Sequence, residues 1–320
     1  MKKNKLFIGA LALLMAFTTA CSSKTENTTT TSQDKDTFTY AINSDPSSTN
    51  PINVSDRWGL TMTNMIYSPL IRVEGDGSLV NELAESTELA KDGLSLTVNL
   101  KKGIKWSDGQ DFTADDVVFT YETKAKKENG NFKSLWINDK PITIEKKDDY
   151  TVVFKFPEPS AAAANNIATE TYIIPKHIYG KVSDFSVKDL QEKPVGTGPY
   201  KLVENKRGEY IKFEANENYY KGKPKVKNVV LRVIQSADTT KVALQKGEID
   251  ASYVLPTDIK DLDTNKLDVY SYSENRIGYL GLNTKTNELK DVKVRQAILY
   301  ALNKGDMNKA AYLDEKYYQN

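Results

Sequence analysis

The chain has 320 residues, 39% of them hydrophobic, and its 44 basic residues nearly balance 43 acidic ones. This balance argues against nucleic acid or an anionic membrane surface as the main partner, because both select strongly basic proteins. The single cysteine, Cys21, rules out an intrachain disulfide. The hydrophobic content is enough for a sizeable core, which we expect to be divided between two domains.

Residues 1–20 are predicted to form a secretion signal peptide, because three lysines precede an apolar run at 6–17 and small residues follow it. The run is too short for a lasting transmembrane helix. The signal holds three of the 44 basic residues and no acid, so 41 basic and 43 acidic residues remain after it, a net charge of −2.

Cys21 directly follows this signal and resembles the cysteine that is lipidated in bacterial lipoproteins, although Thr18 stands where that motif usually has Leu. An ordinary secreted protein with a free thiol is the alternative. A diacyl or triacyl anchor is physically sensible, because one acyl chain holds a protein only marginally at a membrane. Residues 22–36 have no large apolar side chain, so we interpret 21–36 as a lipidated cysteine and a disordered leash.

The next segments alternate between strand and helix patterns. Thr37–Ile42 is predicted to be a core strand, and a polar loop with two prolines follows it. Residues 60–67 are predicted to be a helix that stops before Pro69. Strict alternation of apolar residues from Leu94 to Leu100 then predicts a strand with one buried face, preceded by a turn at Asp92-Gly93.

Trp106 lies between two turns, at Gly103 and at Asp108-Gly109. Thr113 then caps a predicted helix, in which Val117, Val118 and Tyr121 share one face. A second alternating run, Tyr150–Phe156, predicts another strand, and Trp136 is interpreted as a core residue rather than as the wall of a cleft.

Three blocks of this sequence carry a family resemblance: LAESTELAKDGLSLTVNLKKGIKWSDGQDFTADDVVFTYE at 83–122, PVGTGPYKLVE at 194–204 and LNTKTNELKDVKVRQAILYALNK at 282–304. In this order they resemble the extracellular solute-binding proteins of the peptide and nickel ABC-transporter family. The resemblance implies a mixed α/β (α+β), bilobal fold like that of periplasmic binding proteins. Residues 37–270 would then be the first lobe, with a subdomain inserted at about 56–193, and 271–320 would begin the second lobe.

Beyond the inserted region, strands are predicted at 201–204, 209–215 and 228–234, followed by a helix from Ser236 to Lys246. Further strands are predicted at 249–253, 269–273 and 276–283. Asp291 is predicted to cap a helix that Gly305 ends, with a short helix after it. About fifty residues are too few to close a second lobe, so we expect a truncated chain in which the apolar face of the Asp291 helix is uncovered.

The predicted ligand residues come from two places that border the cleft in this family: Asn43, Ser44, Ser47 and Ser48 in the loop after the first strand, and Tyr272, Tyr279 and Asn283 in the crossover to the second lobe. Each set has an alternative interpretation. The first loop has the composition of a plain turn cluster, and alternating tyrosines usually face a core.

No set of residues points to catalysis. His177 is the only histidine, and a lone histidine is more often a packing or capping residue than a ligand. The acid pairs Asp115-Asp116 and Asp148-Asp149 stand at a helix start and in a turn, where solvated carboxylates are ordinary. Gly196 and Gly198 form a GxG without a following phosphate-loop lysine, so we interpret PVGTGPY as a sharp turn between subdomains.

The sequence therefore predicts a binding protein rather than an enzyme, without a cofactor or metal. We expect a lipid-anchored monomer on the outer face of a bacterial membrane that captures oligopeptides for the permease of an ABC importer, by main-chain hydrogen bonds and wet side-chain pockets. The alternatives are a signalling-peptide receptor or a nickel, haem or other-solute carrier of the same fold. A surface hydrolase that hides two carboxylates is a remote alternative.

Overall fold

The computed structural model describes residues 36–312, except 53, 130–131, 161–164, 166, 168–170, 183–191 and 273–278. These residues belong to one compact unit, Asp36–Asn320. The predicted signal peptide, the lipidation of Cys21 and the leash up to residue 35 lie outside the described residues. Within the described residues, none of the helices has the length and apolar character needed to cross a membrane.

A five-stranded sheet with the order β10-β11-β12-β1-β13 brings residues 37–42 beside residues about 200 positions later in the chain. β1 pairs in parallel with β12 and β13, whereas β11 pairs antiparallel with β10 and β12. The strands are β1 (Thr37–Ile42), β10 (Tyr200–Lys206), β11 (Tyr210–Ala215), β12 (Asn228–Val233) and β13 (Ala251–Ser252). β13 is shorter than the predicted strand at 249–253.

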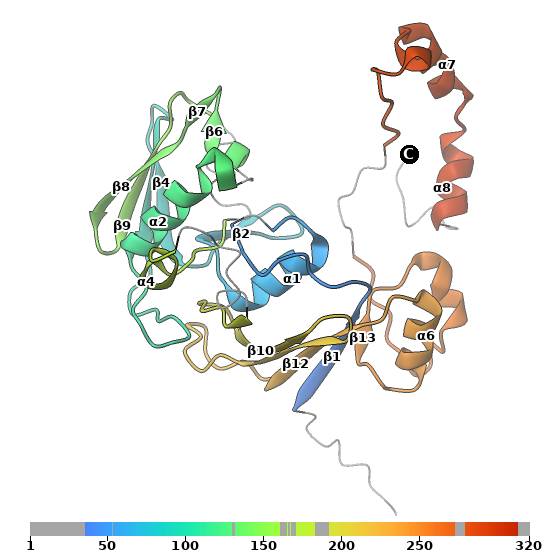
Figure 1. The fold of residues 1–320 in the computed structure, drawn as a ribbon, viewed down its shortest axis with the longest axis horizontal. Coiled ribbons are helices and arrows are strands. Elements are labelled where there is room, and N and C mark those ends of the chain that lie inside the picture. Colours follow the sequence, from blue (N-terminus) through green and yellow to red (C-terminus); the bar gives the residue numbers. More distant parts are fainter. Residues whose placement is uncertain are drawn as a thin grey trace, which may run out of the picture. The chain divides into compact units, whose positions relative to one another are not determined.

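Helices cover both faces of this sheet at β1 (Figure 1). Neighbouring residues of a strand point to opposite faces, so they contact different helices. Ile42 packs with residues of α1 (Arg57–Ile66), whereas Ala41 packs with residues of α6 (Ala237–Gln245). Ser236 caps α6 as predicted, and Gly247 follows the helix with φ +69°. Phe38, which the alternation of the predicted core strand places on the same face as Tyr40 and Ile42, is exposed; it lies beyond the part of β1 that pairs with β13.

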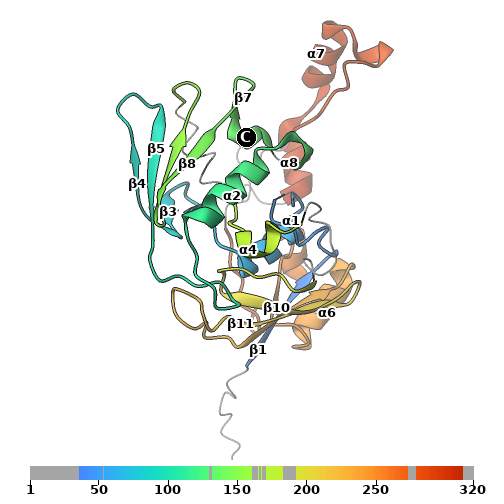
Figure 2. The same ribbon diagram turned by 60° about the vertical axis from the view of Figure 1, so that its left-hand side comes forward.

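A second sheet has the order β4-β5-β9-β8 and carries α2 on one face (Figure 2). The predicted Leu96–Val98–Leu100 and Val152–Phe154 faces are buried in its core, together with Trp106. Trp136 also packs against this core, as predicted. The elements are β4 (Ala84–Leu89), β5 (Ser95–Leu100), α2 (Ala114–Lys124), η1 (Lys127–Asn129), η2 (Phe132–Leu135), β8 (Thr143–Asp148) and β9 (Thr151–Lys155), with the hairpins β2 (Ile71–Val73)–β3 (Leu79–Asn81) and β6 (Trp136–Ile137)–β7 (Lys140–Pro141) and the helix α4 (Lys176–Tyr179).

The PVGTGPY segment runs against the end of α1. The amide of Gly198 donates to the carbonyl of Ile66 at 2.8 Å. A Cβ atom at Gly196 would lie 1.9 Å from the same carbonyl oxygen. Glycine is therefore required here for a close approach between backbones and not for a phosphate.

After β13 the chain forms η3 (Pro256–Asp261), η4 (Asn287–Leu289), α7 (Val292–Ala301) and α8 (Lys304–Tyr312). Asp291 caps α7 as predicted, by accepting from the amide of Lys293 at 2.8 Å. The helix ends at Ala301 and not at Gly305, which lies in the first turn of α8.

The strands predicted at 269–273 and 276–283 are wrong where the structure describes them, because 269–272 and 279–283 are irregular. Their tyrosines are exposed, and a strand needs both a pairing partner and a covered face.

Candidate functional site

The loop after β1 begins at the carboxyl end of a parallel strand, the usual place for ligands in α/β sheets. Hydrogen bonds hold its shape. The carboxylate of Asp45 accepts from the amide of Gly208, in the β10–β11 turn, at 3.0 and 2.9 Å. Asp56 accepts from the amide and the hydroxyl of Ser47 and from the amide of Gly59, so it caps α1 and fixes the loop together.

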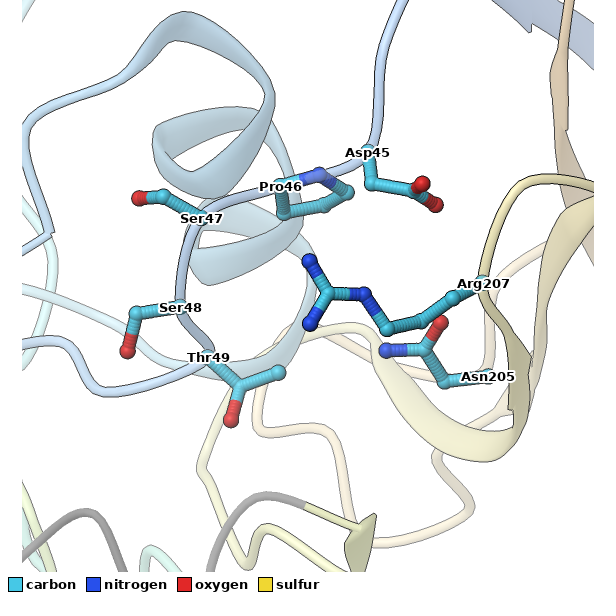
Figure 3. A pocket seen from close by; sticks show the side chains of 7 residues that line it. All are labelled: Asp45, Pro46, Ser47, Ser48, Thr49, Asn205 and Arg207. Atoms are coloured by element: carbon cyan, nitrogen blue, oxygen red, sulfur yellow. The ribbon is translucent and has the colours of Figure 1, made fainter.

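A small polar pocket opens between this loop and the β10–β11 turn (Figure 3). Its lining consists of Asp45, Pro46, Ser47, Ser48, Thr49, Asn205 and Arg207. The volume of about 70 Å³ is well below the roughly 300–1,000 Å³ of sites that enclose a small molecule. In Figure 3 the hydroxyl groups of Ser47 and Ser48 point away from Arg207. This pocket by itself therefore does not hold a peptide.

A second group of side chains, which we call the Arg57 cluster, lies beside the same loop. It consists of Tyr40, Asn43, Arg57, Trp58, Tyr253 and Tyr272. The guanidinium carbon of Arg57 lies 5.3 Å from the ring centre of Trp58 and 4.9 Å from that of Tyr253. Nη2 of Arg57 donates to the hydroxyl of Tyr272 at 3.4 Å. Asn43 accepts from the indole N–H of Trp58 at 2.6 Å. Four segments distant in sequence meet here.

Burial and charge set the protonation of this region. Burial raises the pKa of Tyr40 above 10.0, more than the positive charge of Arg57 lowers it, so the phenol stays neutral at ordinary pH. Burial also acts to raise the pKa of Asp56, but the hydrogen bonds from Ser47 and Gly59 outweigh it and leave the pKa below 3.8. Arg57 therefore lies beside a neutral phenol and next to an acid that is ionised and hydrogen-bonded to the loop.

The predicted ligand residues divide into two groups in the structure. Asn43 and Tyr272 both contact the Arg57 cluster, and Ser47 and Ser48 line the small pocket. Ser44 is exposed in the same loop. Tyr279 is 88% exposed, and the side chain of Asn283 accepts from the amide of Lys285 within its own turn. The alternative in which Tyr272 and Tyr279 face a core does not hold, because both are exposed.

Sequence reasoning missed Arg57, Trp58 and Tyr253. A signal was present for two of them, because Arg57-Trp58 directly follows Asp56, an acidic residue of the type that caps a helix. Nothing local marked Tyr253, which is brought there by the pairing of β13 with β1.

The environment of Asp116 was also predicted wrongly. It is 4% exposed rather than solvated, because the chain at Lys176 covers the start of α2. Its carboxylate accepts from the amides of Thr113 and Lys176, at 3.0 and 2.9 Å, and from the indole of Trp106 at 3.4 Å. Burial raises its pKa above 3.8. These three hydrogen bonds come from two backbone amides and one indole, so we interpret Asp116 as a residue that stabilises the fold.

His177 lies in α4 and pairs with Asp108 at 2.7 Å, with its ring against Trp106, which agrees with a packing role. Among the described residues, groups of three or more histidine, cysteine or acidic side chains placed to hold a metal ion are not found.

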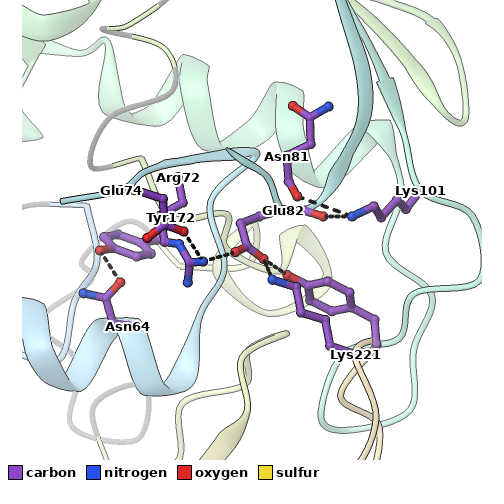
Figure 4. A network of polar contacts seen from close by, with 9 residues as sticks. Asn64, Arg72, Glu74, Asn81, Glu82, Lys101, Tyr172 and Lys221 are labelled. Carbon is purple, nitrogen blue, oxygen red and sulfur yellow. Dashed lines mark hydrogen bonds and ion pairs between the residues drawn. The ribbon is translucent and has the colours of Figure 1, made fainter. Parts of the chain in front are cut away.

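A separate polar network surrounds Glu82, next to β4 (Figure 4). Its side chain is 5% exposed. The carboxylate forms ion pairs with Lys221 at 2.5 Å and with Arg72 at 3.3 Å, and it accepts a hydrogen bond from the hydroxyl of Tyr220 at 2.5 Å. Burial acts to raise the pKa of Glu82, but the contacts with Lys221, Tyr220 and Arg72 outweigh it and lower the pKa. The network joins the β11–β12 connection to the region of the second sheet.

The comparisons with known proteins agree on one family. Residues 78–319 match the model of the bacterial extracellular solute-binding proteins, family 5, middle region. The chain is 36% identical over 322 residues to the oligopeptide-binding protein AppA of Bacillus subtilis, covering 95% of this chain and 58% of AppA. These relatives are solute-binding proteins and not enzymes.

Solved structures give the same result. The substrate-binding protein CtaP of Listeria monocytogenes superposes with a TM-score of 0.80 at 36% identity, covering 88% of this chain and 58% of CtaP. AppA of Bacillus subtilis in complex with a nonapeptide superposes with a TM-score of 0.74 at 33% identity, covering 85% of this chain and 55% of AppA. The mixed α/β fold is confirmed, and the chain spans a little over half the length of these relatives.

Proposed function

The chain belongs to the bacterial extracellular solute-binding proteins of family 5, and on that premise we propose that it captures extracellular oligopeptides for an ABC importer. The observation that carries the choice of peptides is the similarity, over 95% of this chain, to an oligopeptide-binding protein. A related structure of that protein holds a nonapeptide. Peptide capture also fits a site rich in main-chain, amide and phenol groups.

In this proposal the ligand lies along the loop after β1 and against the Arg57 cluster. The loop is fixed by Asp45 and Asp56, so its amides and carbonyls are already in place when the ligand arrives. Preorganised main-chain groups reduce the entropy cost of binding. Exposed phenols at Tyr253 and Tyr272 offer apolar contact area at a small cost in side-chain entropy. Tyr279 and Asn283 are ligand groups only if the ligand reaches the crossover segment.

The proposed domain organisation follows the two sheets. Residues 37–270 form the first lobe with the inserted region at about 56–193, and 271–320 begin the second lobe. The four-stranded sheet is made entirely within the inserted range, which supports this division. A ligand trapped between two lobes by hinge closure needs groups from both lobes.

The proposed location is the outer face of the cell membrane, with lipid on Cys21 and the permease as partner. The test is mass spectrometry of the N-terminal peptide from membranes. We expect a diacyl or triacyl adduct on Cys21 in the wild type and release of the Cys21→Ser protein into the medium. An unmodified thiol at a processed or unprocessed N-terminus would contradict the anchor.

The ligand is tested by native mass spectrometry of the full-length protein purified without denaturation. We expect a series of peptide masses that disappears after unfolding and refolding and returns when peptides are added. A bound nickel ion or haem, with no peptide, would overturn the proposal in favour of another solute of the same family.

A further inference from the structure

The small polar pocket of Figure 3 contains N–H donors that have no acceptor among the described residues. Arg207 lies in the β10–β11 turn, and its side chain extends toward the loop after β1. Within the part of the chain that the structure describes, its guanidinium forms no hydrogen bond and no ion pair. The side-chain amide of Asn205, which comes from the same hairpin, has no hydrogen bond to a described residue either. An arginine has five such donors and an asparagine two, so this wall of the pocket is rich in donors.

The acidic side chains nearest to Arg207 in the sequence are paired elsewhere. Glu204 and Glu209, on the same hairpin, form ion pairs with lysines of that hairpin at 3.0 and 2.8 Å. Asp45 lines the pocket, and both of its oxygens accept from the amide of Gly208, at 3.0 and 2.9 Å. The carboxylate of Asp45 therefore holds the turn in place instead of forming an ion pair with Arg207.

The pocket is formed before any ligand binds. The bond from Gly208 to Asp45 joins the turn to the loop, and Gly208 has φ +80°, which favours glycine. Asp56 holds the loop from its other side through Ser47. The volume of about 70 Å³ exceeds the roughly 10–15 Å³ that one water molecule needs. Such a space suits an ion of the size of acetate or phosphate, and a preformed site reduces the entropy cost of binding it.

A guanidinium binds carboxylate and phosphate oxygens through parallel N–H···O bonds. We propose that this pocket is a binding site for a small oxyanion, a carboxylate or a phosphate, which Arg207 and Asn205 hold. The site is distinct from the proposed peptide site. In the order of the sheet, β10 and β11 lie on the opposite side of β1 from β13, the strand that brings Tyr253 to the Arg57 cluster.

The test titrates the full-length protein with sodium acetate and with sodium phosphate, and uses sodium chloride at equal ionic strength as the reference. Arginine and asparagine are labelled with ¹⁵N, and NMR follows the side-chain N–H signals of Arg207, one of six arginines, and of Asn205. The two signals are assigned by their loss in Arg207→Gln and Asn205→Ala. We expect both signals to shift and saturate with acetate or phosphate but not with chloride. The anion that binds more tightly identifies the class of ligand.

Three variants, each checked for folding by circular dichroism, locate the anion. Arg207→Gln should weaken binding at least about tenfold, followed through the signal of Asn205, because it removes a charge-assisted pair of hydrogen bonds. Lys206→Gln is the matched control, since it removes the same charge at a neighbouring position that does not line the pocket, and it should change the affinity less than about threefold. Asp45→Asn should tighten binding about two- to tenfold, because it removes an opposing charge while its side-chain oxygen still accepts from Gly208.

Shifts that grow without saturation, or that chloride reproduces, would reflect salt alone and would overturn the site. The same conclusion would follow if Arg207→Gln kept the affinity of the wild type, or if Lys206→Gln lost as much affinity as Arg207→Gln. Unchanged or weaker binding by a folded Asp45→Asn protein would contradict an anion beside this carboxylate. None of these results bears on the proposed peptide function, because Arg207 and Asn205 lie outside the Arg57 cluster.

Discussion

The four-stranded sheet region and the segment after Leu255 have similar patterns of apolar residues but differ in how far these side chains are buried. In the sheet region Trp106, Phe112 and Phe154 are fully buried in one core. In the later segment α7 and α8 have no buried residue among those described, and Tyr270, Tyr279 and Tyr300 are 84%, 88% and 92% exposed. An apolar pattern thus predicts burial only where the chain also supplies the opposite side of a core.

The tyrosines show the difference most directly. Tyr121 in α2 packs its ring 4.7 Å from that of Phe154 and donates its hydroxyl to the carbonyl of Ile167 at 2.7 Å. Burial raises its pKa far above 10.0. Tyr300 in α7 has neither burial nor such a partner among its described contacts. Stability should therefore respond strongly to changes in the first region and weakly to changes in the second.

The largest effect is expected for Trp106→Ala. Its side chain is fully buried, so the substitution leaves a cavity and should lower the free energy of unfolding by about 3–5 kcal/mol, measured by urea denaturation. Trp136→Ala is the matched control, because that indole is only half-buried at the edge of the same core, and its loss should be clearly smaller. Equal losses would show that Trp106 is not the centre of this core.

Gly196→Ala should follow. The added methyl would lie 1.9 Å from the carbonyl oxygen of Ile66, so one backbone must shift, at about 2–3 kcal/mol in the free energy of unfolding. Gly75→Ala is the control, because no atom lies within 4 Å of its added methyl, and it should change stability by less than about 0.5 kcal/mol. A neutral Gly196→Ala would mean that the contact with α1 is looser than the geometry indicates.

Glu82→Gln should cost about 2 kcal/mol at neutral pH, because it leaves Lys221 and Arg72 without their buried counter-charge. The pKa of Glu82 is lowered in the folded protein, so its ionised form stabilises the fold above its ordinary pKa of 4.5. This contribution is lost as the pH falls through the folded pKa. The difference between wild type and variant should therefore shrink below about pH 4.5.

The control for this prediction is Glu74→Gln. Glu74 pairs with the same Arg72 at 2.6 Å, but its side chain is 40% exposed, so water screens the pair. Its substitution should change the free energy of unfolding by less than about 1 kcal/mol. A pH-independent loss in Glu82→Gln would show that packing, rather than charge, accounts for the effect.

These differences also mark what could be predicted from the sequence. The strand at Leu94–Leu100 and the helix capped by Thr113 were predicted because their signals are local, in periodicity and capping. The pairing of Glu82 with Lys221 was not, because the partners are 139 positions apart and each looks like a surface charge. Asp116 was misjudged for the same reason, since the covering residue, Lys176, is 60 positions away.

The candidate site was predictable only in part. Asn43 and Tyr272, which were predicted because the family resemblance marks the loop after the first strand and the crossover segment, both contact the Arg57 cluster. Arg57 was missed, because its stacking depends on Tyr253, which reaches it only through the parallel pairing of β13 with β1. Sequence periodicity carries no information about which distant side chains meet at the end of a sheet.

Tyr300→Ala is expected to have the smallest effect and tests the other side of the comparison. The ring is 92% exposed, so its removal forfeits almost no buried area and should change the free energy of unfolding by less than about 0.5 kcal/mol. Tyr121→Ala, the same substitution on a buried ring, should cost several times more. Because alanine favours helices more than tyrosine does, a gain in the free energy of unfolding of about a few tenths of a kcal/mol from helix propensity in α7 is within the expected range. A loss above about 1 kcal/mol would contradict this expectation, because it would mean that another surface covers this face of α7 in solution. The two regions would then both bury their apolar side chains and would differ only in what covers them.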